Sequence, residues 1–171
     1  MASHSHPLDD LPLYLPRLFY TFLGVVELKL AQSGLDQHLQ PGMAHVLLRL
    51  YESDNCIIKD IGRSLRVANG TLTSLLNRMR KAGLIECRRC RQDGRATRVK
   101  LTALGRSLEP RVRRFHEEIT AITEQGFSTT EITAGKAFLA RMLDSLRTAE
   151  ETLRPSPRPT HATTKPRSPR R

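Results

Sequence analysis

Residues 57–101 read IIKDIGRSLRVANGTLTSLLNRMRKAGLIECRRCRQDGRATRVKL, and this stretch decides the fold. Its first part, residues 57–65, is a short amphipathic segment that ends in a bend, and a helix with one polar face is predicted over residues 69–81. Two short runs, residues 84–90 and 97–101, flank a charged turn and predict a β-hairpin. Two helices joined by a tight bend and followed by a hairpin are typical of a winged helix-turn-helix, which places its second helix in a DNA major groove.

Apolar residues in this stretch recur at helical spacing. The second helix carries an i, i+3, i+4, i+7 stripe, and the apolar residues predicted to form the core of a small three-helix head are Ile61, Leu65, Val67, Leu72, Leu75, Leu76 and Met79. Gly62 would let the first helix approach the second closely. Gly83 stands where a glycine after a helix C-terminus adopts a left-handed conformation.

The opposite face of the second helix carries small polar and basic side chains that suit base edges and phosphates. In the hairpin turn, the Asp93-Gly94 pair favours positive backbone angles. The candidate DNA-binding residues on the helix and the turn are Asn69, Thr71, Thr73, Ser74, Asn77, Arg78, Lys81, Arg91, Asp93 and Arg95. An ordinary helix pair and hairpin in another kind of small domain remains the alternative.

The spacing of these motifs resembles the MarR family of bacterial repressors over residues 39–105. The matching positions are Ile61-Gly62-x-x-Leu65-x-Val67, Thr71-Leu72-Thr73-x-Leu75-x-x-Arg78-Met79, Ala82-Gly83-Leu84-Ile85, Asp93-Gly94-Arg95 and Val99-x-Leu101-Thr102-x-x-Gly105. The resemblance implies that Arg95 enters the minor groove and that Asp93 holds it by a charge-assisted bond. Where the family has a capping hydroxyl before its recognition helix, this chain has Ala68, so Asn69 is expected to cap instead.

Long helices are predicted on both sides of the head, residues 39–101. The first covers residues 13–33, with Pro16 in its first turn, and carries more apolar surface than one small head can bury. After the head, Thr102 caps a helix that Pro110 should kink, and a capping box at Ser128 starts another. In the resembled family such helices from two subunits interlock, so residues 13–33 and 102–150 are expected to form a homodimer.

The fold class is therefore expected to be mainly α with a small β-hairpin wing, in which a winged helix-turn-helix head is flanked by long N- and C-terminal dimerisation helices. The winged-helix dimer domain is expected to span residues 13–150. Residues 1–12 are predicted to be a flexible N-terminus. Residues 151–171, rich in proline and arginine and poor in apolar residues, are predicted to be a disordered basic tail.

The 171 residues carry a formal net charge of +11, and the charge is concentrated on the head. Between Arg78 and Arg114 there are thirteen Lys and Arg residues against three Asp and Glu residues, which favours a polyanionic partner. Three cysteines and no secretory signal predict a reducing, cytoplasmic setting. No apolar run was expected to approach the length of a membrane span.

Apolar residues before the motif could line a ligand cavity. The candidates are Phe19, Phe22, Leu23, Val26, Met43 and Val46. The resemblance implies a small phenolic or aromatic effector there, whereas core packing would explain the same residues equally well.

Other potential sites give no comparable signal. Cys87 and Cys90, three apart on a strand, point to opposite faces and have no second ligand pair, so no metal or cofactor site is predicted. A lowered pKa at Cys56 and a redox role is a minority interpretation. His38, His45 and His116 show no ligand spacing, and no cluster of nucleophile and base predicts an enzyme.

The sequence thus predicts a cytoplasmic, homodimeric DNA-binding transcriptional regulator, a repressor of a palindromic operator with double-stranded DNA as its partner. Two alternatives stay open. One is an architectural protein that binds nucleic acid without sequence preference, and the other is a protein-interaction module built on a winged helix.

Overall fold

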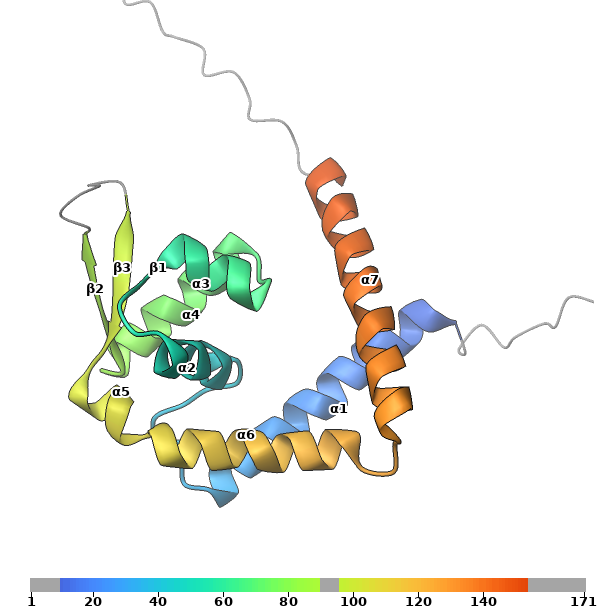
Figure 1. Ribbon diagram of the computed structural model, residues 1–171, viewed down its shortest axis with the longest axis horizontal. Coiled ribbons are helices and arrows are strands. Elements are labelled where there is room, and N and C mark those ends of the chain that lie inside the picture. The colour runs from blue at the N-terminus through green and yellow to red at the C-terminus, as the bar shows by residue number, and fades with distance from the viewer. Residues whose placement is uncertain (1–9, 90–95, 154–171) are drawn as a thin grey trace, which may run out of the picture. The chain divides into compact units, whose positions relative to one another are not determined.

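The computed structural model describes residues 10–89 and 96–153 of the chain. The elements, in chain order, are α1 (Leu11–Gln32), α2 (Met43–Glu52), β1 (Cys56–Ile57), α3 (Ile58–Leu65), α4 (Asn69–Lys81), β2 (Ile85–Arg89), β3 (Thr97–Leu101), α5 (Ala103–Ser107), α6 (Glu109–Glu124) and α7 (Thr129–Leu153). They form the predicted mainly helical winged-helix fold with a small antiparallel sheet (Figure 1). The chain divides after Gln125 into two compact units.

Helix α1 begins two residues earlier than predicted. Pro12 therefore occupies the first turn and Pro16 lies inside the helix, which corrects the expected place of Pro16. Gly34, with φ of +63°, follows the end of the helix in a left-handed conformation. Only Val26 and Leu30 of α1 are buried, and the salt bridge from Lys29 to Glu118, with N–O at 2.7 Å, joins the helix to α6.

The expectation about membrane-length segments was wrong for α1. This helix is 22 residues long, reaches a mean hydropathy of 1.2 over 18 residues, and is long and apolar enough to cross a membrane by those two measures. Charged residues interrupt the apolar run of this helix, but they are too few to lower its mean hydropathy below that of a membrane span. A helix whose apolar surface is covered by a partner has the same composition.

The core of the head joins α2, α3, α4 and the sheet. Ile61, Leu72, Leu75, Leu76 and Met79 are buried as predicted, and Leu65 and Val67 pack partly buried against them. Leu35, Leu39, Leu47 and Leu50 extend this core toward α6, where Val112, Phe115 and Ile119 are buried. The same apolar cluster therefore supports both the motif helices and α6.

The sheet has three strands in the order β1-β3-β2, one more than predicted. Strands β2 and β3 pair from Ile85↔Leu101 to Arg89↔Thr97, which is the expected hairpin. On the other edge of β3, the two residues of β1 pair as Cys56↔Val99 and Ile57↔Arg98. Two residues are too few for an alternating pattern, so this strand is defined by its pairing and not by its own sequence.

The chain forms two helices before and at Pro110, where the sequence predicted a single kinked helix. Helix α5 stops at Ser107, and Pro110 lies in the first turn of α6. Proline has no N–H to donate, which costs nothing in a first turn, so a break is preferred to a kink here. Thr102 caps α5 as predicted, since its hydroxyl accepts the Gly105 N–H.

The predicted cap of α4 was wrong. Asn69 is the first residue of α4, and Ala68 holds the capping position without a side-chain hydrogen bond. Helix α3 likewise has no side-chain cap, because Ile57 precedes it.

Helix α7 forms the second unit. Its predicted capping box is present, because the Ser128 N–H donates to Glu131 at 2.8 Å and the Glu131 N–H donates to the Ser128 hydroxyl at 3.3 Å. None of the residues of α7 is buried. Its large exposed side chains include Phe138, Leu139, Leu143 and Leu146.

Candidate nucleic-acid interface and adjoining cavity

Helix α4 has one buried and one exposed face. Its four apolar stripe residues are buried, whereas all seven of the predicted contact residues on this helix are exposed: Asn69, Thr71, Thr73, Ser74, Asn77, Arg78 and Lys81. The helix ends at Gly83, with φ of +70°, where the Leu84 N–H donates to Met79 O at 3.0 Å. The structure therefore presents a continuous polar face on α4.

Close packing fixes α4 against its neighbours. A Cβ added at Gly62 would lie 3.2 Å from Leu72 Cδ2, so the glycine allows α3 to approach α4 as predicted. Gly42, with φ of +87°, similarly faces Leu75, at 3.2 Å from a built Cβ to Cδ2. Contacts on the buried face thus set the position of the exposed one.

Two of the seven exposed residues are engaged within the chain. The Thr73 hydroxyl donates to Asn69 O at 2.8 Å, so toward an external group it can act only as an acceptor. Arg78 donates to Gln40 Oε1 at 2.9 Å. Ser74 and Asn77 lie in the middle of the helix. Neither side chain forms a hydrogen bond with another described residue, so both keep their full donor and acceptor capacity toward a ligand.

The hairpin supplies additional cations. Arg89 and Lys100 are exposed, whereas Arg88 pairs with Glu86 at 2.8 Å on its own strand. The predicted wing residues Arg91, Asp93 and Arg95, together with Cys90, lie outside the described residues.

A cavity of about 330 Å³ lies between α1, α2, α4 and α6. Four of the predicted pocket residues line it, namely Phe19, Phe22, Leu23 and Val26. Met43 and Val46 do not, because their side chains are buried in the core. On α2 the cavity is lined instead by Ala44 and His45, neither of which is among the buried residues of the helix.

Sequence reasoning missed the contributions of α4 and α6 to this cavity. Thr71, Leu75 and Arg78 of α4 line it, as do Phe115, His116 and Ile119 of α6. The spacing of Phe115 and Ile119 marks an apolar stripe on α6, but only the packing of α6 against α1 and α2 brings that stripe to the cavity. Arg78 is therefore at once a residue of the polar α4 face and a cavity residue.

The polar residues of the cavity are His45, His116, Arg78 and the neutral Thr71. Burial lowers the pKa of His45 from its ordinary value, and repulsion from His116 lowers the pKa further. Arg78 contributes a guanidinium that remains charged. A mostly apolar cavity with these groups at its wall suits a flat apolar molecule that carries an acidic group.

The cysteines form no pair among the described residues. Cys56 is buried, and its thiol lies 2.7 Å from Ser53 O, while burial raises the pKa of the Cys87 thiol. A raised pKa disfavours the reactive thiolate. In the described part of the chain, no group of three or more His, Cys, Asp or Glu side chains could hold a metal ion.

Comparison with known proteins decides the family. Residues 39–97 match the MarR family. The chain is 31% identical over 100 residues to the organic hydroperoxide resistance transcriptional regulator of Bacillus subtilis, an alignment that covers 58% of this chain and 67% of that protein. This chain belongs to the MarR family. Like other MarR-family proteins, it is a DNA-binding transcriptional regulator. It spans between half and two thirds of the length of the curated relatives it matches.

Solved MarR structures share the fold. The structure of Streptococcus pneumoniae FabT in complex with DNA is 26% identical, has a TM-score of 0.57, and covers 80% of this chain and 94% of its own. Bordetella bronchiseptica BpsR, whose DNA binding is regulated by 6-hydroxynicotinic acid, is 23% identical with a TM-score of 0.66 and covers 82% of this chain and 99% of its own. The family and fold are those of transcriptional regulators and not of enzymes.

Proposed function

We propose that this MarR protein is a cytoplasmic homodimeric repressor that binds a palindromic operator and responds to a small aromatic acid. The observation that carries the proposal is the exposed polar face of α4 beside a hairpin that carries Arg89 and Lys100. One such face per subunit, related by a two-fold axis, would read the two halves of a palindrome. Occupying the promoter would then block transcription.

The recognition helix would supply specificity. Ser74 and Asn77 lie in the middle of the exposed face, where side chains can reach base edges, whereas Lys81 at the C-terminal end suits a phosphate. Arg91 and Arg95 of the hairpin turn would contact backbone and minor groove, with Asp93 holding Arg95. FabT, which shares the fold, was solved in complex with DNA, and this supports a DNA-bound state.

Dimerisation would cover the apolar surface left exposed on α1 and α7. On α1 the exposed side chains include Leu18, 61% exposed, Tyr20, 68%, and Leu28, 67%. On α7, Leu146 is 54% exposed. Apolar exposure of this extent on long helices is typical of an obligate interface, and a second copy of the chain would bury both surfaces.

Footprinting of the DNA around the protein's own coding region tests the proposal. We expect protection of one short palindrome, with two chains bound per site by light scattering of the complex. Uniform protection along the duplex would instead identify an architectural nucleic-acid binder. A monodisperse monomer at micromolar concentration would contradict the homodimer.

Substitutions on α4 should separate specificity from general affinity. Asn77→Ala, or Ser74→Ala, should weaken operator binding by about 1–3 kcal/mol if one base contact is lost, with little change on a scrambled duplex. Arg95→Ala should weaken both duplexes, because a backbone contact carries no sequence information. Fluorescence anisotropy titrations of both duplexes measure the difference. Equal losses on both duplexes for Asn77→Ala would refute a base contact.

The cavity would be the effector site, because its wall includes Thr71, Leu75 and Arg78 of the recognition helix itself. An occupant that contacts Arg78 would compete with the Arg78–Gln40 hydrogen bond and so alter how α4 is held. The regulation of BpsR by 6-hydroxynicotinic acid supports the chemical class.

Binding of an aromatic carboxylate should be linked to proton uptake. In the free protein, desolvation at the cavity wall and repulsion from His116 lower the pKa of His45, and a carboxylate in the cavity would raise this pKa again. Affinity should therefore increase as pH falls from about 8 to about 6, as the histidine gains its proton. Calorimetry with benzoate measures this; benzyl alcohol should show no pH dependence, and His45→Gln should show a weaker one, because His116 lines the same cavity. Benzoate binding that is independent of pH would exclude His45 from the site.

A further inference from the structure

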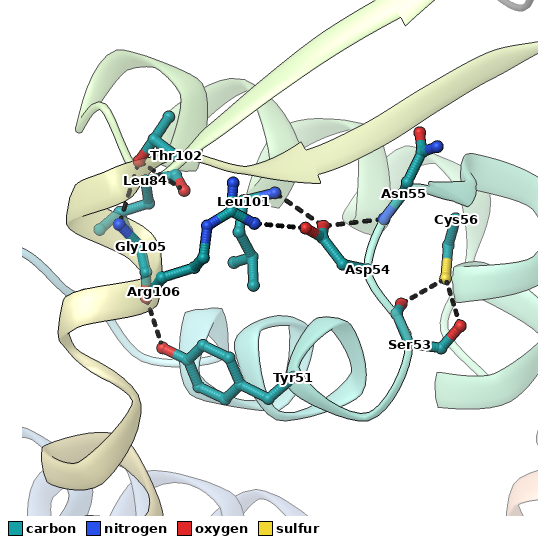
Figure 2. A network of polar contacts seen from close by, with 10 residues as sticks. All are labelled: Tyr51, Ser53, Asp54, Asn55, Cys56, Leu84, Leu101, Thr102, Gly105 and Arg106. Atoms are coloured by element: carbon teal, nitrogen blue, oxygen red, sulfur yellow. Dashed lines mark hydrogen bonds and ion pairs between the residues drawn. The ribbon is translucent and has the colours of Figure 1, made fainter.

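The turn between α2 and β1 holds the base of the wing through one carboxylate. Asp54 Oδ1 accepts the backbone N–H of Leu101 at 2.9 Å and that of Asn55 at 2.8 Å, and Asp54 Oδ2 accepts the guanidinium of Arg106 at 2.5 Å. Figure 2 shows these bonds converging on Asp54 from the end of β3, from the turn itself and from α5. A single side chain therefore connects three parts of the head.

The register of the sheet explains why a side chain is needed at this position. Pairing of β1 with β3 stops at Cys56↔Val99, so Leu101 of β3 would next face residue 54. Asn55, with φ of +59°, turns the chain away from an extended strand. The Asp54 carboxylate then takes the Leu101 N–H that a longer β1 would have bound.

A second bond from the same turn reaches the wing. Arg98, the second residue of β3, donates to Asn55 O at 2.7 Å. The turn thus binds β3 at Arg98 and at Leu101. Both bonds lie on the edge of β3 that pairs with only two residues of β1. The other edge of β3 pairs with β2, which follows the recognition helix through Gly83.

The carboxylate is ionised at neutral pH. Partial burial alone would raise the pKa of Asp54, but the bonds from the Leu101 and Asn55 N–H groups and from Arg106 outweigh it and lower the pKa. All three bonds are therefore charge-assisted.

We propose that Asp54, through Leu101 and Arg106, positions the wing relative to the recognition helix so that both can contact DNA at once. This rests on the proposed contact between the wing and the DNA backbone. Asp54 itself touches no DNA in this proposal and acts through β3. Without it, β3 would keep its pairing with β2 and β1 and the Arg98–Asn55 bond but lose the bonds at Leu101 and Arg106, which hold the base of the hairpin.

For Asp54→Asn, a purely electrostatic effect and a positioning role predict opposite changes in DNA affinity. Removing a negative charge from a basic head should tighten DNA binding if only electrostatic attraction changes. A misplaced wing should weaken binding and release fewer counterions, because fewer phosphates are contacted. A role confined to stability would leave both quantities unchanged in the folded protein.

The test measures anisotropy of a mixed-sequence duplex of about 30 base pairs at several salt concentrations, with full-length dimeric protein. Asp54→Asn and Arg106→Gln should each weaken binding about three- to tenfold and reduce the salt slope by about 1 per subunit. Asp60→Asn, an exposed carboxylate paired with Arg63 at 3.5 Å on α3, controls for loss of a negative charge and should bind as tightly or more tightly. Arg114→Gln, on α6, controls for the loss of a positive charge.

The outcomes are distinct. If Asp54→Asn folds and binds DNA with the wild-type salt slope, the proposal is overturned. It is also overturned if only Arg106→Gln loses DNA affinity, because Arg106 would then be a direct phosphate contact. If Asp54→Asn does not fold, hydrogen exchange of the Leu101 amide is measured in the Arg106→Gln protein without DNA. Exchange faster than in the wild-type protein supports the proposal, and exchange at the wild-type rate overturns it. Wild-type protein without salt-dependent binding, or an Asn77→Ala variant that binds the operator duplex as tightly as the wild-type protein, would instead contradict the proposed function.

Discussion

Raising the salt concentration from about 50 to about 200 mM should weaken operator binding by roughly 10³–10⁵-fold, if the dimer contacts six to ten phosphates. The reason is that each phosphate neutralised by Lys or Arg releases a condensed counterion, and added salt opposes that release. The expected contacts lie on the recognition helix and the hairpin, where Lys81, Arg89 and Lys100 are exposed. The logarithm of affinity against the logarithm of salt concentration, measured by anisotropy, gives the slope directly.

The ion pairs of the structure indicate which cations should contribute to the salt dependence of DNA binding. Several arginines of the basic segment are paired with carboxylates within the chain, at Arg88–Glu86, Arg106–Asp54, Arg113–Glu109 and Arg114–Glu118. Arg89 has no ion pair with a described carboxylate, so Arg89→Gln should reduce the slope by about 1 per subunit, whereas Arg114→Gln should leave it unchanged. A flat salt response of the wild-type protein would contradict the charge argument for the whole head.

Gly105→Ala should strongly destabilise the fold around α5. A Cβ at this position would lie 2.2 Å from the backbone oxygen of Leu84 and 3.2 Å from Leu101 Cδ2. A backbone atom cannot rotate away as a side chain can, so α5 would have to leave the turn after α4. We expect a loss of about 3–5 kcal/mol in the free energy of unfolding, a large fraction of the stability of a small domain.

Hydrogen bonds add to the cost of moving Gly105. Its N–H donates to the Thr102 hydroxyl at 3.0 Å, and its carbonyl accepts the Tyr51 hydroxyl at 2.8 Å, as Figure 2 shows. Partial burial raises the pKa of Tyr51 to about 12, so this donor keeps its proton throughout the neutral range. Displacing α5 would break both bonds and disturb the wing base.

Gly70→Ala is the matched control. Gly70 lies in the first turn of α4, where a built Cβ meets nothing within 4 Å, so alanine should leave stability unchanged or raise it by less than about 1 kcal/mol. Thermal unfolding followed by circular dichroism compares the two variants. A Gly105→Ala protein with a wild-type midpoint would show that α5 can shift without cost.

The head was predictable because its information is local. The apolar stripe of Leu72, Leu75, Leu76 and Met79 fixes both the existence of the helix and its buried face, and the opposite residues must then be exposed. Gly83 and the hairpin runs likewise carry their own turn and strand signals. Fold class, family and the polar face therefore followed from sequence periodicity and motif spacing.

Features that depend on contacts between distant segments were not predictable in the same way. Strand β1 exists because Cys56 and Ile57 meet β3, and α5 lies where Gly105 contacts Leu84 and Tyr51. Met43 and Val46 belong to the core and not to the cavity, because the orientation of α2 is set by its packing against α6 and α3.

By itself the sequence determined the motif helices and the two hairpin strands of the head and which face of the recognition helix is polar, since these depend on spacing along the chain. Tertiary structure alone decided that Arg78 shares a cavity with His45 and His116 and that Asp54 meets Leu101 and Arg106. Residues 54 and 106 are far apart in the chain and carry no common pattern. Their contact arises only when α2, β3 and α5 pack around one core, which is a property of the whole head and not of any segment.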